Sequence, residues 1–172
     1  MPSEISTEVI LDTSVLINFL VIRRLDLLQG HPRYRFAVTN HVRAEITEHY
    51  PEQKAQLESA LDTGWLQEIT VIDSRELDVF VELSRSGRLG AGECSATSVA
   101  VCRKLPLAID DKIARKSAAA LHPKIELLDT EALVLSLIRE NSIGVEEADE
   151  IKHEWEREHR FKLSFASFAE RI

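Results

Sequence analysis

The chain has 172 residues, of which 44% are hydrophobic and 29% charged, and its formal net charge is −8. This length suits one domain with a substantial core, and the composition is typical of a globular protein. No apolar run approaches the roughly 20 residues that a membrane-spanning helix needs, and the first residues do not resemble a secretory signal. The two cysteines, Cys94 and Cys102, fall in one predicted helix at a spacing too long for a disulfide. We therefore expect a cytoplasmic protein without membrane contact.

The negative charge is concentrated near the C-terminus. Between residues 140 and 160 there are eight acidic side chains and three Lys or Arg. A uniformly acidic surface would disfavour a polyanionic partner. Because the acidity here is local, the net charge does not exclude a nucleic-acid substrate.

Short apolar runs alternate with segments of helical spacing along the whole chain. The apolar runs predict strands at residues 9–11, 35–39, 65–72, 105–109 and 125–128. Helical spacing and cap signals predict helices over 13–28, from a cap at Asn40 to about 46, and over 51–61, 74–84, 93–103, 112–121, 130–140, 145–160 and 164–172. Strands that alternate with helices are typical of α/β proteins. We expect a three-layer α/β/α sandwich with a central, mostly parallel sheet of four to five strands.

Acidic residues recur where the predicted strands end and the next helices begin. They are Asp12, Glu45, Glu93, Asp110 and Asp111. Asp12 follows the first strand, Asp110 and Asp111 follow the fourth, and the other two fall in the first turns of helices. Right-handed crossovers place the carboxyl ends of parallel strands at one edge of the sheet, where ligands bind. We therefore expect these carboxylates to converge.

Four of the five acids have an ordinary explanation when taken alone, whereas Asp12, between an apolar strand and a mostly apolar helix, is harder to explain in this way. Glu45 could be a solvated helix residue, Glu93 could favour a helix N-terminus, and the aspartate pair could cap a helix. Together they indicate a metal site, because clustered carboxylates repel one another until a cation is bound. One or two Mg²⁺ or Mn²⁺ ions would suit oxygen ligands and phosphoryl chemistry. Zinc is disfavoured, since no His or Cys shows the spacing of a zinc site.

Four segments carry a family resemblance in the same order along the chain. They are VILDTSVLIN at 9–18, VTNHVRAEI at 38–46, GAGECSA at 90–96 and LAIDDKIAR at 107–115. Together they resemble the PIN-domain nucleases, and most of all a prokaryotic PIN-like branch of the toxin type. The resemblance implies a PIN-like catalytic domain at 1–141, with 142–172 as a helical extension packed on the same domain. It also implies Mg²⁺- or Mn²⁺-dependent cleavage of RNA, a small antitoxin protein as partner, and a homodimer.

Carried over residue by residue, the resemblance makes Asp12, Glu45, Glu93 and Asp111 the catalytic acids, with Asp110 as a neighbour or substitute. Asp12, Glu93 and Asp111 would bind the metal. Many family members have Thr or Ser just before the final acidic turn, where this chain has Ile109 and Asp110. Which aspartate of the pair enters the metal shell therefore stays open.

Three further residues are predicted to bind substrate. Ser14, or its neighbour Thr13, would orient a carboxylate or a water molecule, and Lys112 and Arg115 would contact phosphate. A second basic group consists of Arg23, Arg24, Arg33, Arg35 and Arg43, which could follow the RNA backbone or simply be solvated. The alternative function is a catalytically inactive PIN-like scaffold that binds RNA or protein through the same cleft.

Overall fold

The computed structural model describes residues 6–172. Its centre is a parallel sheet with the strand order β3-β2-β1-β4-β5. The strands are β1 (Thr7–Leu11), β2 (Tyr34–Thr39), β3 (Leu66–Ile69), β4 (Leu107–Ala108) and β5 (Leu127–Leu128). The predicted α/β class and the number of strands are confirmed.

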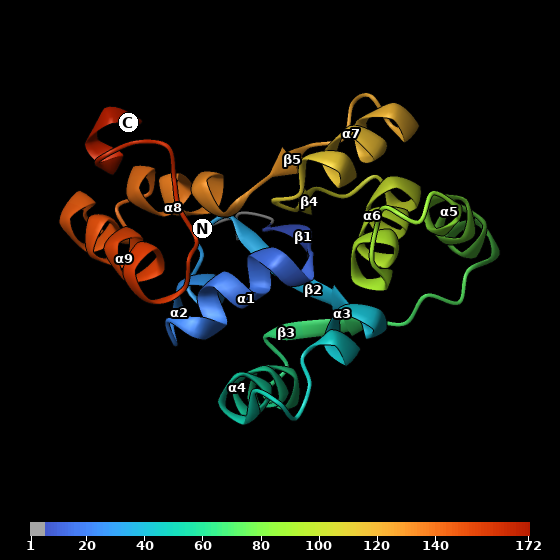
Figure 1. The fold of residues 1–172 in the computed structure, drawn as a ribbon, viewed down its shortest axis with the longest axis horizontal. Coiled ribbons are helices and arrows are strands. Elements are labelled where there is room, and N and C mark those ends of the chain that lie inside the picture. Colours follow the sequence, from blue (N-terminus) through green and yellow to red (C-terminus); the bar gives the residue numbers. More distant parts are fainter. Residues whose placement is uncertain (1–5) are drawn as a thin grey trace, which may run out of the picture.

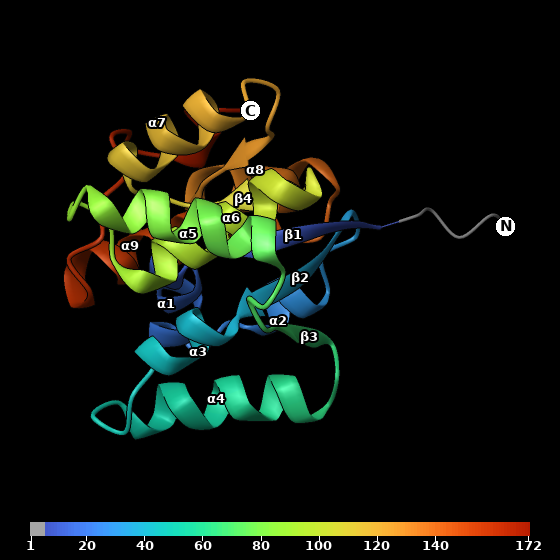
Figure 2. The same ribbon diagram turned by 90° about the vertical axis from the view of Figure 1, so that its right-hand side faces the viewer.

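Helices cover both faces of this sheet. They are α1 (Thr13–Val21), α2 (Asp26–Gln29), α3 (Asn40–Glu45), α4 (Pro51–Asp62), α5 (Ser74–Arg85), α6 (Ala91–Arg103), α7 (Lys112–Leu121), α8 (Thr130–Arg139) and α9 (Val145–Glu158), followed by the 3₁₀ turn η1 (Phe168–Glu170). Figure 1 shows α5, α6 and α7 on one side of the sheet and α1, α8 and α9 on the other. Figure 2, turned by 90°, shows α5 beside α6, with α4 beyond the β3 edge. This is the three-layer α/β/α arrangement that the sequence predicts.

The central strands are fully buried because both faces of the sheet are covered. Val9, Ile10 and Leu11 of β1 are inaccessible to solvent. Continuous apolar strands of this kind are typical of parallel sheets. On α6, the small side chains of Ala96 and Ala100 are also inaccessible and let this helix approach the sheet closely. None of the helices within residues 6–172 is both long and apolar enough to cross a bilayer.

Several predicted boundaries are wrong. The predicted helix 13–28 is divided in two: α1 ends at Val21, Arg23 takes a positive φ of 56°, and α2 begins at Asp26. The predicted cap at Asn40 is also wrong, because the side chain of Thr39 accepts the backbone N–H of Val42. The later predicted strands at 65–72, 105–109 and 125–128 are longer than β3, β4 and β5, since apolar residues continue beyond the paired segments, and β2 begins one residue before its predicted start.

The predicted helix 164–172 is replaced by irregular chain and the short turn η1. Asp149 of α9 prevents a regular helix there by binding two neighbouring groups. Its carboxylate accepts the Ser167 hydroxyl at 2.6 Å and the Phe168 N–H at 2.8 Å. These tertiary bonds bring Phe168 into the core, where it is fully buried.

Candidate functional site

Asp12 stands at the centre of the candidate site. It ends β1 and caps α1, and its backbone N–H donates to the Ala108 carbonyl oxygen at 2.9 Å, which fixes it against β4. Its Oδ2 accepts the Ser14 hydroxyl at 2.6 Å and the Ser14 N–H at 3.2 Å. Its Oδ1 is buried and has no hydrogen-bond partner among residues 6–172. Burial raises the pKa of Asp12, with a smaller contribution from the charge of Glu45.

Glu45 ends α3 and joins it to the starts of α1 and α6. Its Oε1 accepts the Gly92 N–H at 2.8 Å, and its Oε2 accepts the Thr13 hydroxyl. Gly92 is required for this contact. A Cβ atom there would lie 2.6 Å from Thr13 Oγ1 and 2.8 Å from Glu45 Cδ, closer than real Cβ atoms approach. The sequence pattern alone did not identify Gly92 or Thr13 as partners of Glu45.

Glu93 lies in the first turn of α6 and accepts the Gly90 N–H at 2.9 Å. Burial raises its pKa, and the charges of Asp12, Asp111 and Glu45 raise it further. The charges of these three carboxylates therefore act on Glu93 from the ends of β1 and α3 and from the start of α7.

The two aspartates after β4 have different surroundings. Asp111 is half-buried and caps α7 by accepting the Ala114 N–H at 2.8 Å. The carboxylate of Asp110 instead accepts hydrogen bonds from Thr130 and Asn18. Burial raises the pKa of Asp110, and Asp129 adds to this by repulsion. Sequence reasoning missed Asn18, although an amide within an apolar helix was a usable signal.

The predicted substrate residues have distinct positions. Ser14 is bound to Asp12, as described above, and Lys112 is exposed at the start of α7 beside Asp111. Arg115 binds protein backbone: its Nη1 donates to the carbonyl oxygens of Ile109 at 2.9 Å and Leu128 at 2.8 Å. This guanidinium therefore joins the carboxyl ends of β4 and β5.

The early arginines are mostly engaged in ion pairs. Arg23 pairs with Glu52, Arg24 with Asp26 and Glu147, Arg33 with Glu140, and Arg43 with Glu58 and Glu68. Two acceptors raise the pKa of Arg43 well above its ordinary value. These pairs favour the interpretation that this basic group is part of the solvated surface.

The donor set fits a hard divalent cation. Four carboxylates, one with an unpartnered buried oxygen, provide the oxygen ligands that Mg²⁺ or Mn²⁺ prefers. Within residues 6–172, no three His, Cys, Asp or Glu side chains meet in the geometry of a ready-made metal site. Mg²⁺ usually retains several waters and needs only one or two direct carboxylates, so the cluster suits an ion that keeps part of its water shell.

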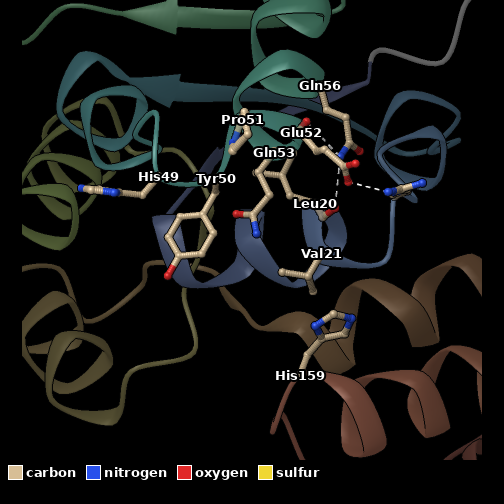
Figure 3. A pocket seen from close by; sticks show the side chains of 10 residues that line it. Leu20, Val21, His49, Tyr50, Pro51, Glu52, Gln53, Gln56 and His159 are labelled. Carbon is tan, nitrogen blue, oxygen red and sulfur yellow. Dashed lines mark hydrogen bonds and ion pairs between the residues drawn. The ribbon is translucent and has the colours of Figure 1, made fainter.

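A separate hollow lies between α1 and α4 (Figure 3). Its lining includes Leu20 and Val21 of α1, Tyr50 and Gln53 around the start of α4, and His159 after α9. None of the four clustered acids lines it. The acidic cluster and this hollow are therefore different features of the surface.

Comparison with known proteins identifies the class of this fold and site. A family model described as a PIN domain, DUF3368, matches residues 8–166. The chain belongs to this PIN-domain family, as the sequence motifs predicted. No match was found among curated proteins.

Three solved structures are similar to the chain. A PilT N-terminus domain protein, SSO1118, from the hyperthermophilic archaeon Sulfolobus solfataricus P2 has a TM-score of 0.52 and 18% identity, over 76% of this chain and 92% of that one. PAE2754 from Pyrobaculum aerophilum has a TM-score of 0.52 and 15% identity, over 81% and 94%. VapBC2 from Rickettsia felis, bound to a DNA fragment from its promoter, has a TM-score of 0.49 and 15% identity, over 72% and 98%. The first two likenesses establish the fold.

Proposed function

We propose that this protein is a metal-dependent endoribonuclease that hydrolyses RNA phosphodiester bonds at the cluster of Asp12, Glu45, Glu93 and Asp111. The observation that carries this proposal is the carboxylate of Asp12 at the carboxyl end of β1, which is buried and has an unpartnered Oδ1 among the described residues. The raised pKa of Glu93, to which burial and all three other carboxylates contribute, supports it. Such a cluster destabilises the protein unless a cation or a proton neutralises it. Membership of the PIN-domain family supports the same chemistry.

Each acid has a proposed role. Asp12, Glu93 and Asp111 would hold Mg²⁺ or Mn²⁺, as one or two ions. The bound ion would neutralise charge on the phosphoryl group and lower the pKa of a water molecule. Glu45, held by Thr13 and Gly92, would orient the attacking water and accept its proton. A P–O bond to the water oxygen forms, the P–O bond to the leaving sugar oxygen breaks, and that oxygen takes a proton from solvent.

Other side chains would bind and orient the substrate. Ser14 would keep Asp12 in place through its hydroxyl hydrogen bond. Lys112, exposed next to Asp111, would contact a phosphate of the RNA. Arg115 would act indirectly, by holding together the strand ends from which Asp111 projects.

The test is cleavage of a fluorescent single-stranded RNA and a structured RNA by purified protein with Mn²⁺, together with calorimetric titration of Mn²⁺. We expect cleavage that EDTA stops and that Asp12→Asn or Glu93→Gln abolishes without unfolding the protein. Glu82→Gln, an exposed acid on α5, is the matched control and should cleave normally. Cleavage that survives in both site variants would refute the proposal. Absence of Mn²⁺ binding would favour the catalytically inactive scaffold.

The proposed partners follow from the family resemblance. They are a small antitoxin protein and a second copy of this chain, and both remain predictions. Light scattering of the purified protein would test the homodimer. Growth arrest on expression of the wild type, absent for Asp12→Asn, would support a toxin role.

A further inference from the structure

A set of hydrogen bonds beside the acidic cluster joins three elements of the fold. Asp110 Oδ1 accepts the Thr130 N–H at 2.9 Å, and Asp110 Oδ2 accepts the Thr130 hydroxyl at 2.7 Å. Asn18 Nδ2 donates to Asp110 Oδ2 at 3.0 Å and to Thr130 Oγ1 at 2.9 Å. Asn18, Asp110 and Thr130 thus form a closed triangle of hydrogen bonds, called the Asp110 triangle below. It ties α1 and the end of β4 to the first residue of α8.

Two residues of the Asp110 triangle belong to the same chain segments as two acids of the cluster. Asn18 is on α1, whose cap is Asp12, and Asp110 directly precedes Asp111, the cap of α7. The position of Asp12 relative to Asp111 therefore depends on how α1 is held against the end of β4. One backbone hydrogen bond, from Asp12 N–H to the Ala108 carbonyl oxygen, holds the end of β1 against the end of β4. The Asp110 triangle connects α1 to the end of β4 a second time, through side chains.

The triangle is well placed to be rigid. Thr130 is inaccessible to solvent, and its hydroxyl and N–H both bind the same carboxylate. The Asn18 backbone oxygen accepts the indole N–H of the fully buried Trp155 at 2.6 Å, so α9 supports the same point of α1. An ionised carboxylate has about four acceptor positions. Three of those on Asp110 are occupied by protein donors.

We infer that Asn18, Asp110 and Thr130 are positioning residues, which hold Asp12 and Asp111 in register, and that Asp110 contacts neither metal nor substrate. This inference rests on the proposed function, since it names how the same site is assembled. It also decides between the two aspartates that the sequence left open. Asp111 is the ligand, and Asp110 is the support.

Exchanging the two partners provides the decisive experiment. Asn18→Asp alone places two carboxylates at hydrogen-bond distance, where both cannot be ionised without strong repulsion. The double variant Asn18→Asp/Asp110→Asn restores one carboxylate and one amide in exchanged positions. Asp110→Ala removes the acceptor and leaves the buried Thr130 N–H without a partner. Mn²⁺ affinity, urea unfolding and RNA cleavage are measured for each variant, for Asp110→Asn alone and for Asp111→Asn.

If the triangle positions the site, the exchanged variant binds Mn²⁺ within about threefold of wild type, although residue 110 carries no charge. Asn18→Asp and Asp110→Ala lose on the order of tenfold or more in Mn²⁺ affinity, as misplaced ligands do. Asp111→Asn loses at least as much, and no change at position 18 restores it. If the exchanged variant instead loses Mn²⁺ as severely as Asp111→Asn, Asp110 is itself a ligand and the inference is overturned.

The outcomes also separate this inference from the proposed function. If the wild type binds Mn²⁺ but cleaves no RNA, the proposed activity fails, while the Mn²⁺ affinities still decide the role of Asp110. If Asn18→Asp lowers the Mn²⁺ affinity by the same factor in the Asp110→Asn variant as in the wild type, positions 18 and 110 are not coupled and the inference fails. In that case RNA cleavage by the wild type would still support the nuclease.

Discussion

Gly92→Ala should damage the candidate site even though a Gly→Ala change within a helix ordinarily stabilises it by about 1 kcal/mol. The added methyl carbon would lie 2.6 Å from Thr13 Oγ1 and 2.8 Å from Glu45 Cδ. Glu45 must therefore move, and it loses its 2.8 Å hydrogen bond from the Gly92 N–H. A hydrogen bond to a charged group contributes about 1.5–3 kcal/mol, and the lower end applies because Glu45 is exposed.

A loss of about 1.5 kcal/mol at the site corresponds to roughly a tenfold lower rate of Mn²⁺-dependent RNA cleavage. Crowding of a packed position costs about 1–3 kcal/mol, so the gain in helix propensity is cancelled and unfolding in urea should not shift in favour of the variant. Gly90→Ala, at the N-cap of the same helix, is the matched control. Its methyl would meet Glu45 Oε1 at 3.7 Å and Glu93 Oε2 at 3.9 Å, which are ordinary contacts. If both variants cleave RNA at the wild-type rate, the proposed role of Gly92 in holding Glu45 is refuted.

Three further changes test the electrostatics and the packing. Asp12→Asn removes a carboxylate whose pKa is raised by burial, so above the ordinary carboxyl pKa of about 4 the metal-free variant should have a higher melting temperature than wild type, by about 2–4 °C per kcal/mol gained. The variant should also lose the rise in melting temperature that Mn²⁺ causes in the wild type. A lower melting temperature of the metal-free variant would contradict this prediction. Burial, with the charge of Arg33, lowers the pKa of His31 to about 4, so its contribution to stability is complete above the unfolded value of about 6.5 and is lost as the pH falls towards 4. Urea unfolding at pH 7 and pH 5 should show about 1–2 kcal/mol of this loss in the wild type and not in His31→Phe. Trp155→Phe should lower the unfolding free energy by about 2–3 kcal/mol, because it leaves a void and an unpaired Asn18 carbonyl oxygen; an unchanged urea midpoint would show that α9 adds little to the fold.

The central, mostly parallel sheet could be predicted, although not the order of its strands, because burial leaves a direct mark on the sequence. A strand covered on both faces must be apolar throughout, as Val9, Ile10 and Leu11 are. The positions of the acids relative to those strands then followed from the geometry of parallel sheets. The boundaries were less predictable, since Arg23 breaks the first helix through a backbone conformation that its residue type does not announce.

The sequence by itself thus determined the class of fold, the family and the positions of Asp12 and Asp111 after β1 and β4, at one edge of the sheet. Only the tertiary structure separated Asp110 from Asp111 and joined Glu45 to Thr13 and Gly92. Asp110 is bound by residues 92 and 20 positions away in the chain. Side chains of adjacent residues leave the backbone in different directions, and which partner each one meets depends on elements that only packing brings together. Local patterns record how much of a residue is buried, but they do not record which distant hydrogen-bond partner it finds.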